Sequence, residues 1–252
     1  MGIFVKNDSQ IQKMRVASKI VAGTHSLLEK HIKPGVSTRE LNAIADDYIR
    51  SQGAIPSFLG YEMTGEGFPA SICVSVNEEV IHGIPGLRRL KNGDIVSIDI
   101  GAYIDKFHGD AARTYAVGTI SQERQTLMDA AKQSFFEAMT YCRHGRHLHE
   151  ISAAVESYVQ KFGFSIVREF CGHGVGRKLH EEPQIPHYKQ QNRGPRLQKG
   201  MTLAIEPMVV IGKADIRILN NNWTVVTKDG KSAAHYENTV AVTDGEPEIL
   251  TW

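Results

Sequence analysis

The feature that most constrains the fold is an internal repeat with a period of 110 residues. A shift by this period superposes Gly35, Glu40, Ala43, Tyr48 and Gly53 on Gly145, Glu150, Ala153, Tyr158 and Gly163. In both copies the apolar spacing predicts a long helix, a break that contains glycine, a second helix and a glycine stop. The second copy places its two helices at 125–142 and 148–162. The repeat therefore favours a fold that uses one half-fold twice.

After each predicted helix pair the pattern changes from helical to alternating. Alternation predicts strands in the segments 71–76, 94–100, 202–206 and 236–242. Short connections favour antiparallel pairing, with helices covering one side of the sheet, so we expect an α+β fold. The polar segment 189–196 is expected to be a surface loop, and no low-complexity linker separates the copies. We predict a single domain over residues 1–252, with halves at approximately 1–118 and 119–252.

Composition excludes several classes of protein. The chain has 29 Lys+Arg, 28 Asp+Glu and 41% hydrophobic residues, which is typical of a soluble globular protein. It contains no apolar run long enough to span a bilayer and no signal-peptide pattern, so we expect a cytoplasmic protein that does not bind membranes. A net charge of +1 argues against sequence-specific binding of nucleic acid. The three cysteines form no Cys-x-x-Cys pair, which disfavours a thiolate zinc site.

Two aspartates lie on predicted neighbouring strands. The apolar residues of the segment 94–100 share one face, which leaves Asp99 on the other face. A hairpin loop centred on residues 104–105 would set Asp99 directly opposite Asp110, about 5 Å apart at Cβ. Two carboxylates at this distance repel each other unless one is protonated or a cation lies between them. The alternative is ordinary surface charge, or a pair between Asp110 and Arg113.

Three further residues resemble metal ligands. His173 is flanked by glycines that allow close backbone packing, Glu206 ends an apolar strand, and Glu237 lies in the middle of a predicted strand. A carboxylate in a buried strand needs a partner, and a cation can provide one. Four carboxylates and one imidazole suit two Mn, Fe, Co or Zn ions about 3.5–4 Å apart. From spacing alone, the metal site and separate structural roles both stay open.

Other catalytic motifs are absent from the sequence. The run GHGVG at 172–176 lacks the G-x-G-x-x-G order, and HEEP at 180–183 is not H-E-x-x-H. Neither a phosphate-binding P-loop nor a G-x-S-x-G nucleophile elbow occurs. Nucleotide binding, a zincin protease and a serine hydrolase are therefore disfavoured.

Six separated motifs occur in an order that points to one family. They are CVSVNEEVIHGIP (73–85), GDIVSID (93–99), HGD (108–110), CGHGVG with HEEP (171–176 and 180–183), GMTLAIEP (200–207) and YE (236–237). In this set the chain resembles the type I methionine aminopeptidases of the bacterial kind over almost its whole length. The resemblance implies the pita-bread fold, whose two halves are pseudo-symmetric.

The resemblance also implies roles for individual residues. It assigns two divalent ions (Co, Mn, Fe or Zn) to the ligands Asp99, Asp110, His173, Glu206 and Glu237, with Asp110 and Glu237 between both ions. Glu206 would also transfer a proton, and His82 and His180 would be catalytic residues that do not bind metal. No such role is expected for the other histidines at positions 108, 144, 147, 149 and 187.

By the same resemblance an apolar pocket receives the methionine side chain. Its lining is expected to be Tyr61, Phe68, Cys73, Leu179 and Trp223, together with His82 and His180. The chain departs from the family at Leu179, where an aromatic residue is frequent, and at Phe58, where some members have cysteine. The loop 61–68 also looks longer than usual, so the exact lining of the pocket is open.

The implied substrate is a nascent polypeptide with a small second residue. A monomer is expected, and the basic runs 88–91 and 143–146 could make a transient contact with the ribosome, although such runs are more often solvated. Two alternatives are kept: another pita-bread peptidase of the aminopeptidase P or prolidase type, and an inactive member of the fold that serves as a binding module.

Overall fold

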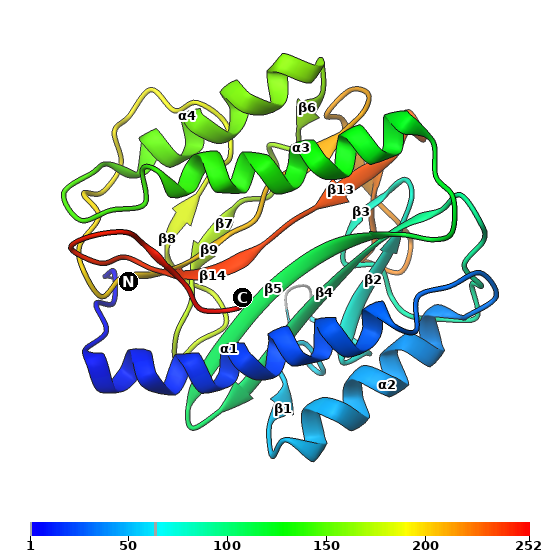
Figure 1. The fold of residues 1–252 in the computed structure, drawn as a ribbon, viewed down its shortest axis with the longest axis horizontal. Helices are drawn as coiled ribbons and strands as arrows, with labels where there is room; N and C mark the ends of the chain where they lie inside the picture. The colour runs from blue at the N-terminus through cyan, green and yellow to red at the C-terminus, as the bar shows by residue number, and fades with distance from the viewer. Residues whose placement is uncertain (1, 63–64) are drawn as a thin grey trace.

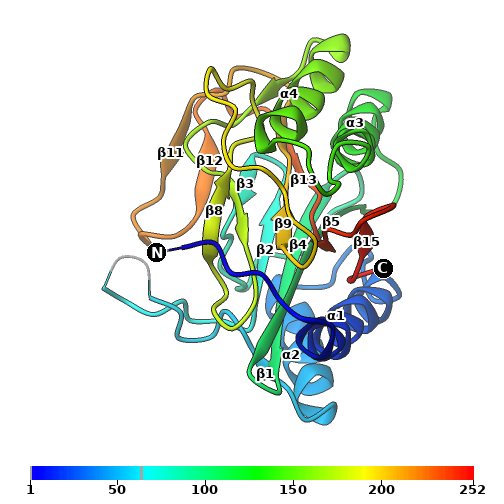
Figure 2. The ribbon, with the colours of Figure 1, turned by 90° about the vertical axis from the view of Figure 1, so that its left-hand side faces the viewer.

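Four α-helices and a set of antiparallel strands make up the computed structural model, which describes residues 2–62 and 65–252. The helices are α1 (Asp8–Glu29), α2 (Thr38–Ser51), α3 (Gln122–Met139) and α4 (Leu148–Val159), and α4 continues into a 3₁₀ turn, η1 (Gln160–Phe162). Figure 1 shows α1 and α2 along one edge of the strands and α3 and α4 along the opposite edge. The view in Figure 2 places all four on the same side of the sheets, as the alternation of patterns predicted.

Local signals set where the helices begin. Asn7 and Gln10 form a capping box at the start of α1, and Ser37 and Glu40 form another at the start of α2. Ser121 accepts a hydrogen bond from the Arg124 amide, so α3 begins three residues before the expected position 125 and ends at Met139 rather than at 142.

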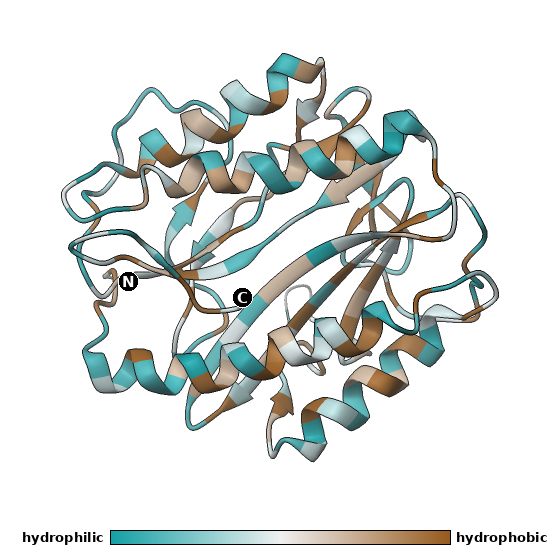
Figure 3. Ribbon diagram, viewed as in Figure 1, coloured by the Kyte–Doolittle hydropathy of each residue, from teal (hydrophilic) through white to brown (hydrophobic). Residues whose placement is uncertain are grey.

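The first half builds a sheet with strand order β1-β4-β2, in which β5 also pairs with β4. Its strands are β1 (Ile55–Pro56), β2 (Ile72–Val76), β4 (Ile95–Ile104) and β5 (Phe107–Ala116). Apolar residues of α1 and α2 pack on β2 and β4 in one cluster that includes Val21, Leu41 and Ile98. Figure 3 shows this sheet largely hydrophobic at β2, whereas each helix carries both kinds of residue. This pattern is typical of amphipathic helices that pack their apolar faces on a sheet.

The second half builds a sheet with strand order β15-β14-β9-β7-β8. Its strands are β7 (Gly172–Gly174), β8 (Glu181–Ile185), β9 (Thr202–Ile205), β14 (Asn238–Ala241) and β15 (Glu248–Ile249). The helices α3 and α4 pack on it through a cluster that includes Phe135, Ile151 and Leu203. Two small sheets, β13-β10-β6 and β11-β12-β3, use β3 (Glu79–Ile81), β6 (Ser165–Ile166), β10 (Met208–Val210), β11 (Ile216–Ile218), β12 (Val225–Thr227) and β13 (Ala233–His235).

The 110-residue shift reappears in the geometry of the helix breaks. Gly35 has φ +94° and Gly145 has φ +87°, and their amides donate to the carbonyls of Leu90 and Leu197 at 2.7 and 2.9 Å. The helices that follow begin at Thr38 and Leu148, which are also 110 residues apart. These equivalences support the proposed division of the chain into two related halves.

Two expectations about the other segments have different outcomes. The segment 189–196 is largely exposed, as expected for a surface loop. The predicted strand 236–242 is wrong at its start, because β14 begins at Asn238 and Glu237 lies before it. Glu237 donates its amide to the Ala112 carbonyl of β5 at 2.9 Å instead of pairing along β9. Among the described residues, no helix is both long and apolar enough to cross a membrane.

Candidate active site

The hairpin β4–β5 brings Asp99 and Asp110 onto one face, but not in the predicted register. Asp99 pairs with Ala112 and Asp110 pairs with Gly101, so the two aspartates are diagonal neighbours rather than directly opposite each other. The turn is centred on Asp105 and Lys106, which have φ values of +52° and +70°. A two-residue hairpin turn of this hand needs positive φ at both central positions, which β-branched Ile104 resists. The turn lies one residue later than predicted, so the partner of Asp99 shifts by two residues, from 110 to 112, and a shift of two preserves the face.

The backbone around these ligands joins the two halves of the chain. The Asp110 amide donates to Thr239 Oγ1 at 3.0 Å, and the Thr239 hydroxyl donates back to the Asp110 carbonyl at 2.9 Å. The Glu237 amide donates to the carbonyl of Ala112, which lies on the same strand as Asp110. Asp110 and Glu237 are therefore fixed to each other through a seam between β5 and β14.

Arg113 strengthens this seam and was not singled out as a site residue from sequence. Its guanidinium donates to the Glu237 carbonyl and to Asn238 Oδ1, the latter at 2.6 Å, and to the Thr251 carbonyl at 3.2 Å. It is thus committed to main-chain and amide oxygens, and the expected alternative of an ion pair with Asp110 is not observed. Among the described residues, no arginine forms an ion pair with any of the four carboxylates.

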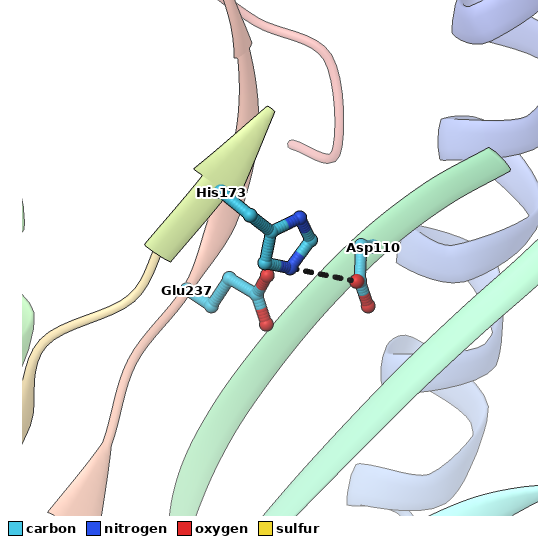
Figure 4. Close-up of side chains that lie close together, drawn as sticks. All are labelled: Asp110, His173 and Glu237. Carbon is cyan, nitrogen blue, oxygen red and sulfur yellow. Dashed lines mark ion pairs between the residues drawn. The ribbon is translucent and has the colours of Figure 1, made fainter. Parts of the chain in front are cut away.

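The short strand β7 presents His173 between the two halves. A Cβ on Gly172 would lie 2.4 Å from the Ala204 carbonyl oxygen, and one on Gly174 would lie 2.2 Å from the Glu182 carbonyl oxygen. Glycine is required at both positions because β7 is squeezed between β8 and β9. Figure 4 shows His173 converging with Asp110 and Glu237. Its Nε2 lies 3.8 Å from Asp110 Oδ2 and 3.5 Å from Glu206 Oε1.

The chemistry of this cluster fits divalent cations. Asp99, Asp110 and Glu237 each have a buried carboxylate oxygen without a hydrogen-bond partner. Burial raises the pKa of Asp99 to about 7, and burial and neighbouring carboxylates raise the pKa values of Asp110 and Glu237 well above the usual range. Such a set is unfavourable unless protons or cations neutralise it.

The imidazole of His173 is also prepared for a metal ion. Its Nδ1 bonds to the Gly174 carbonyl at 2.9 Å, which leaves the Nε2 lone pair facing the carboxylates. Burial and nearby His180 lower the pKa of His173 to about 3, so the ring is neutral. Ligand atoms of Asp110, His173 and Glu237 all lie within 4.8 Å of one another.

His235 is a further candidate that sequence reasoning missed. Its Nε2 lies 3.4 Å from Glu206 Oε2, is buried, and has no hydrogen-bond partner. Together with Glu206 and Glu237 it makes a second group of ligand atoms within 4.8 Å, whereas Asp99 lies outside both groups. In the sequence only its position two residues before Glu237 could have pointed to it. In the structure its amide and its carbonyl are both bonded to the Thr114 hydroxyl.

Glu206 directly follows β9, and its backbone is hydrogen-bonded to a histidine outside the proposed ligand set. The Glu206 amide donates to Nε2 of His187 at 3.0 Å. Burial raises the pKa of Glu206 well above its usual value, so the carboxyl can hold a proton. His187 thus supports the backbone of Glu206 through a hydrogen bond.

His82 and His180 flank the cluster on its open side. His82 follows β3 with φ +56°, a left-handed conformation that few residues other than glycine adopt, and burial lowers its pKa to about 4. His180 is exposed, its ring centroid lies 4.2 Å from that of His173, and its Nδ1 bonds to the Tyr61 hydroxyl. Both imidazoles therefore lie where a molecule held at the carboxylates would meet them.

All twelve predicted site residues line one small cavity of about 50 Å³. Its walls are Phe58, Tyr61, Phe68, Cys73, His82, Asp99, Asp110, His173, Leu179, His180, Glu206, Trp223 and Glu237. Phe58, Phe68, Cys73, Leu179 and Trp223 form an apolar cluster on one side of it, with the ring of Phe68 edge-on to Trp223 at 5.2 Å. The departures noted at Phe58 and Leu179 thus lie in this wall. In the loop 61–68, residues 63 and 64 lie outside the described part of the chain.

Comparison with known proteins places these features in one family. Residues 12–244 match the model of metallopeptidase family M24. The chain is 53% identical over 249 residues to methionine aminopeptidase 1 of Bacillus subtilis, covering 99% of each chain. It is 45% identical over 253 residues to methionine aminopeptidase of Escherichia coli, covering 100% of this chain and 94% of that protein.

Solved structures agree with this result. The crystal structure of methionine aminopeptidase from Rickettsia prowazekii superposes with a TM-score of 0.96 at 37% identity and covers all of both chains. A prolidase from Pyrococcus furiosus has a TM-score of 0.80 at 21% identity, and the match covers 98% of this chain and 65% of that one. The second likeness concerns the fold alone. Together the matches confirm the expected α+β pita-bread fold.

Proposed function

The chain belongs to metallopeptidase family M24, and we propose from the site described above how it acts and with which residues. It is a methionyl aminopeptidase, a hydrolase that removes the N-terminal methionine from polypeptides. The observation that carries the proposal is the cluster of four carboxylates and a neutral imidazole beside an apolar cavity. None of the four carboxylates has a lysine or arginine partner among the described ion pairs.

Five side chains would hold two divalent ions, which could be Co, Mn, Fe or Zn. These ligands would be Asp99, Asp110, His173, Glu206 and Glu237, and the hydrogen bonds of the seam hold Asp110 and Glu237 in place relative to each other. When bound, such a pair lowers the pKa of water toward neutrality and polarises a carbonyl group. His235 lies close enough to Glu206 and Glu237 to modulate the same ligands.

Glu206 would transfer the proton from the attacking water to the departing amine. The bond from its amide to His187 fixes its backbone beside the cluster, where its carboxyl would meet both the water and the amine. A general acid and base in this position contributes about 10²- to 10⁴-fold to the rate.

His180 would stabilise the carbonyl oxygen of the scissile bond as that oxygen gains negative charge. The Tyr61 hydroxyl at Nδ1 orients the ring and leaves Nε2 for this contact. His82, held in its left-handed conformation, would position the amide nitrogen or the departing residue.

The apolar wall formed by Tyr61, Phe68, Cys73, Leu179 and Trp223 would receive the unbranched methionine side chain. The substrate class is nascent polypeptides, and we propose a preference for a small second residue. A binding module without activity is disfavoured because every proposed ligand and both flanking histidines line one cavity.

Peptide turnover tests this function directly. Metal-free protein is supplied with Co, Mn, Fe or Zn, and cleavage of Met-Ala-Ser is compared with cleavage of Ala-Pro and Gly-Pro peptides. We expect Met-Ala-Ser to be cleaved after methionine and the proline peptides to remain intact. Turnover of the proline peptides alone would favour a prolidase-type activity, and no turnover with any ion would favour the binding module.

Three finer expectations remain predictions. We propose that the protein is a monomer and that it acts in the cytoplasm. Contact with ribosomal RNA is weakened as a proposal, because Arg88 already pairs with Glu79 at 3.1 Å and Arg143 with Glu246 at 2.7 Å. Charge reversal at Arg88 and Arg89 in a salt-dependent ribosome pelleting assay decides the matter.

A further inference from the structure

A larger cavity of about 790 Å³ continues from the candidate active site toward the surface. It shares Tyr61, His82, His173, His180 and Glu206 with the small cavity, so the two spaces meet at the three histidines and Glu206. Its opposite wall includes Gly2 and Phe4 of the amino-terminal segment 2–6. Figure 2 shows this segment passing β8 before it enters α1. Residues far apart in sequence therefore enclose one cleft.

The segment 2–6 is anchored firmly at Lys6. The Lys6 amide donates to the Gly200 carbonyl at 2.7 Å, and Nζ donates to Glu181 Oε2 at 2.6 Å. The side chains of this ion pair are only 3% and 10% exposed. A Cβ on Gly200 would lie 2.3 Å from the Lys6 carbonyl oxygen, and one on Gly176 would lie 2.5 Å from Lys6 Cε. The protein thus keeps two positions free of side chains where Lys6 packs.

This anchor places an exposed aromatic ring on the wall of the cleft. Phe4 is 59% exposed although it is a large apolar residue, and its carbonyl accepts a bond from Lys6 Nζ at 3.3 Å. Glu181, the partner of Lys6, directly follows His180, so the segment is tied to the strand next to the catalytic histidine. An exposed phenylalanine fixed beside an active site is suited to contact a ligand.

We propose that the segment 2–6 binds the substrate residues beyond the second, with Phe4 as the apolar contact for one of them. The inference rests on the proposed function. If methionine occupies the small cavity and the scissile bond lies at the carboxylates, the polypeptide continues through the space that both cavities share, along the wall that bears Phe4. An extended chain turns alternate side chains to one wall, so Phe4 contacts the third or the fourth residue, not both equally.

A leucine scan of the substrate tests this contact. The peptides are Met-Ala-Ser-Ser-Ser-Ser and its variants with leucine at the third, fourth or fifth position, and kcat/KM is measured for each. We expect leucine at the third or the fourth position to raise kcat/KM about 3- to 10-fold over the serine peptide, as partial burial of one apolar side chain would. In Phe4→Ser this preference disappears, whereas Met-Ala-Ser, whose serine offers little apolar surface to Phe4, is still cleaved.

A matched control and a binding measurement complete the test. Phe162 is 41% exposed on the turn after α4 and does not line the cleft, so Phe162→Ser should keep the leucine preference. The affinity of a leucine peptide labelled at its carboxyl end is measured by fluorescence polarisation in the inactive Glu206→Gln background. Adding Phe4→Ser to this background should weaken the affinity for the leucine peptide by the same factor by which leucine raises kcat/KM in the unmodified protein.

The failures of the two proposals are distinguishable. A flat leucine scan in the unmodified protein, or a preference that survives Phe4→Ser, overturns the role of segment 2–6 while Met-Ala-Ser is still cleaved. Absence of Met-Ala-Ser cleavage with every ion overturns the proposed function and the inference with it.

Discussion

At the scale of single residues, a variant at His180 tests whether this histidine acts in catalysis without binding metal. Its imidazole touches the Tyr61 hydroxyl and faces His173, but it belongs to neither group of ligand atoms. We expect His180→Ala to lower kcat for Met-Ala-Ser about 10²- to 10³-fold, because a donor to the developing oxyanion is lost. Metal affinity, measured by isothermal titration calorimetry, should change less than about threefold.

His149 provides the control for this variant. It is a histidine whose Nδ1 bonds to the Arg193 carbonyl, and it lines neither cavity at the carboxylates, so His149→Ala should leave kcat unchanged. Near-normal turnover in His180→Ala would remove the assigned role, and a large loss of metal affinity would instead make His180 part of the ligand set.

The proposed site residues were first suggested by residue types that contradict their surroundings, and the resemblance to a family then implied their roles. Glu206 after an apolar strand, and His173 between glycines, are unusual without a ligand or a close neighbour. His235 and Arg113 carry no such local signal. Their roles arise from contacts with Glu206 and with the Glu237 carbonyl, which only the folded backbone creates. The exact pairing of Asp99 also depended on a turn whose position the alternation leaves undetermined.

At the scale of elements, the link between segment 2–6 and β8 depends on a buried ion pair. Lys6→Ala leaves Glu181 with a nearly buried charge and no cation at that position. Removing one partner of a buried pair typically costs about 3–5 kcal/mol, and we expect a loss of this size in the free energy of unfolding in urea. The double variant Lys6→Met/Glu181→Leu should be less destabilised than Lys6→Ala, because no unpaired charge remains.

An exposed pair of the same kind serves as the reference. Lys199 and Asp244 lie 2.7 Å apart with side chains 58% and 66% exposed, so Lys199→Ala should destabilise the protein much less than Lys6→Ala. Equal losses for Lys6→Ala and Lys199→Ala would show that the amino-terminal anchor adds nothing beyond a surface contact.

The helix breaks of the two copies allow a test of the repeat at the same scale. Gly35 and Gly145 have φ of +94° and +87°, and a Cβ added at either position would meet no atom within 4 Å. Alanine is therefore opposed by backbone strain alone, so Gly35→Ala and Gly145→Ala should each cost about 1–3 kcal/mol and by similar amounts. Gly245→Ala, where φ is not positive and space is free, should be nearly neutral. Thermal unfolding measures all three, and a large difference between Gly35→Ala and Gly145→Ala would contradict equivalent breaks.

The elements that sequence predicted best are those with local signals. Capping boxes and glycine stops fix the helices close to their expected bounds. The predicted strand 236–242 was wrong at its start, because residues 236 and 237 continue the alternating pattern, yet the Glu237 amide pairs with β5 of the other half. A contact between segments more than a hundred residues apart competes with local pairing, and alternation alone does not reveal it.

At the scale of the whole molecule, the two halves meet where the carboxylates are concentrated. Asp110 and Glu237 are pinned across the seam by Thr239 and Ala112, so the same backbone bonds that join the halves also bring the negative charges together. Without cations, protons must neutralise this cluster for the fold to persist. Metal binding and the union of the halves are therefore thermodynamically linked.

This linkage predicts how the stability of metal-free protein depends on pH. A carboxyl whose pKa is raised by folding stabilises the fold fully below its ordinary pKa, and this stability is lost as pH rises through the folded value. For Asp99 the loss spans the range from about 3.8 to about 7, and for Asp110 and Glu237 it extends to higher pH. Burial lowers the pKa values of His25 and His187 to about 3. These two histidines reduce the stability of the fold only when the pH falls below about 6.5, the ordinary pKa of histidine.

Between pH 7 and pH 8.5 the carboxyls therefore determine most of the pH dependence of stability, and these histidines contribute little. The melting temperature of chelator-treated protein should fall over this range, whereas that of protein loaded with Mn or Co should hold or rise, because cations replace protons at ligands that must be ionised to bind them. Asp110→Asn/Glu237→Gln, which removes two of the charges, should flatten the curve of the metal-free protein and abolish its stabilisation by metal. Parallel curves for metal-free and loaded protein would mean that the cluster is neutralised by something other than the added ions, and the linkage between the seam and the metal centre would fail.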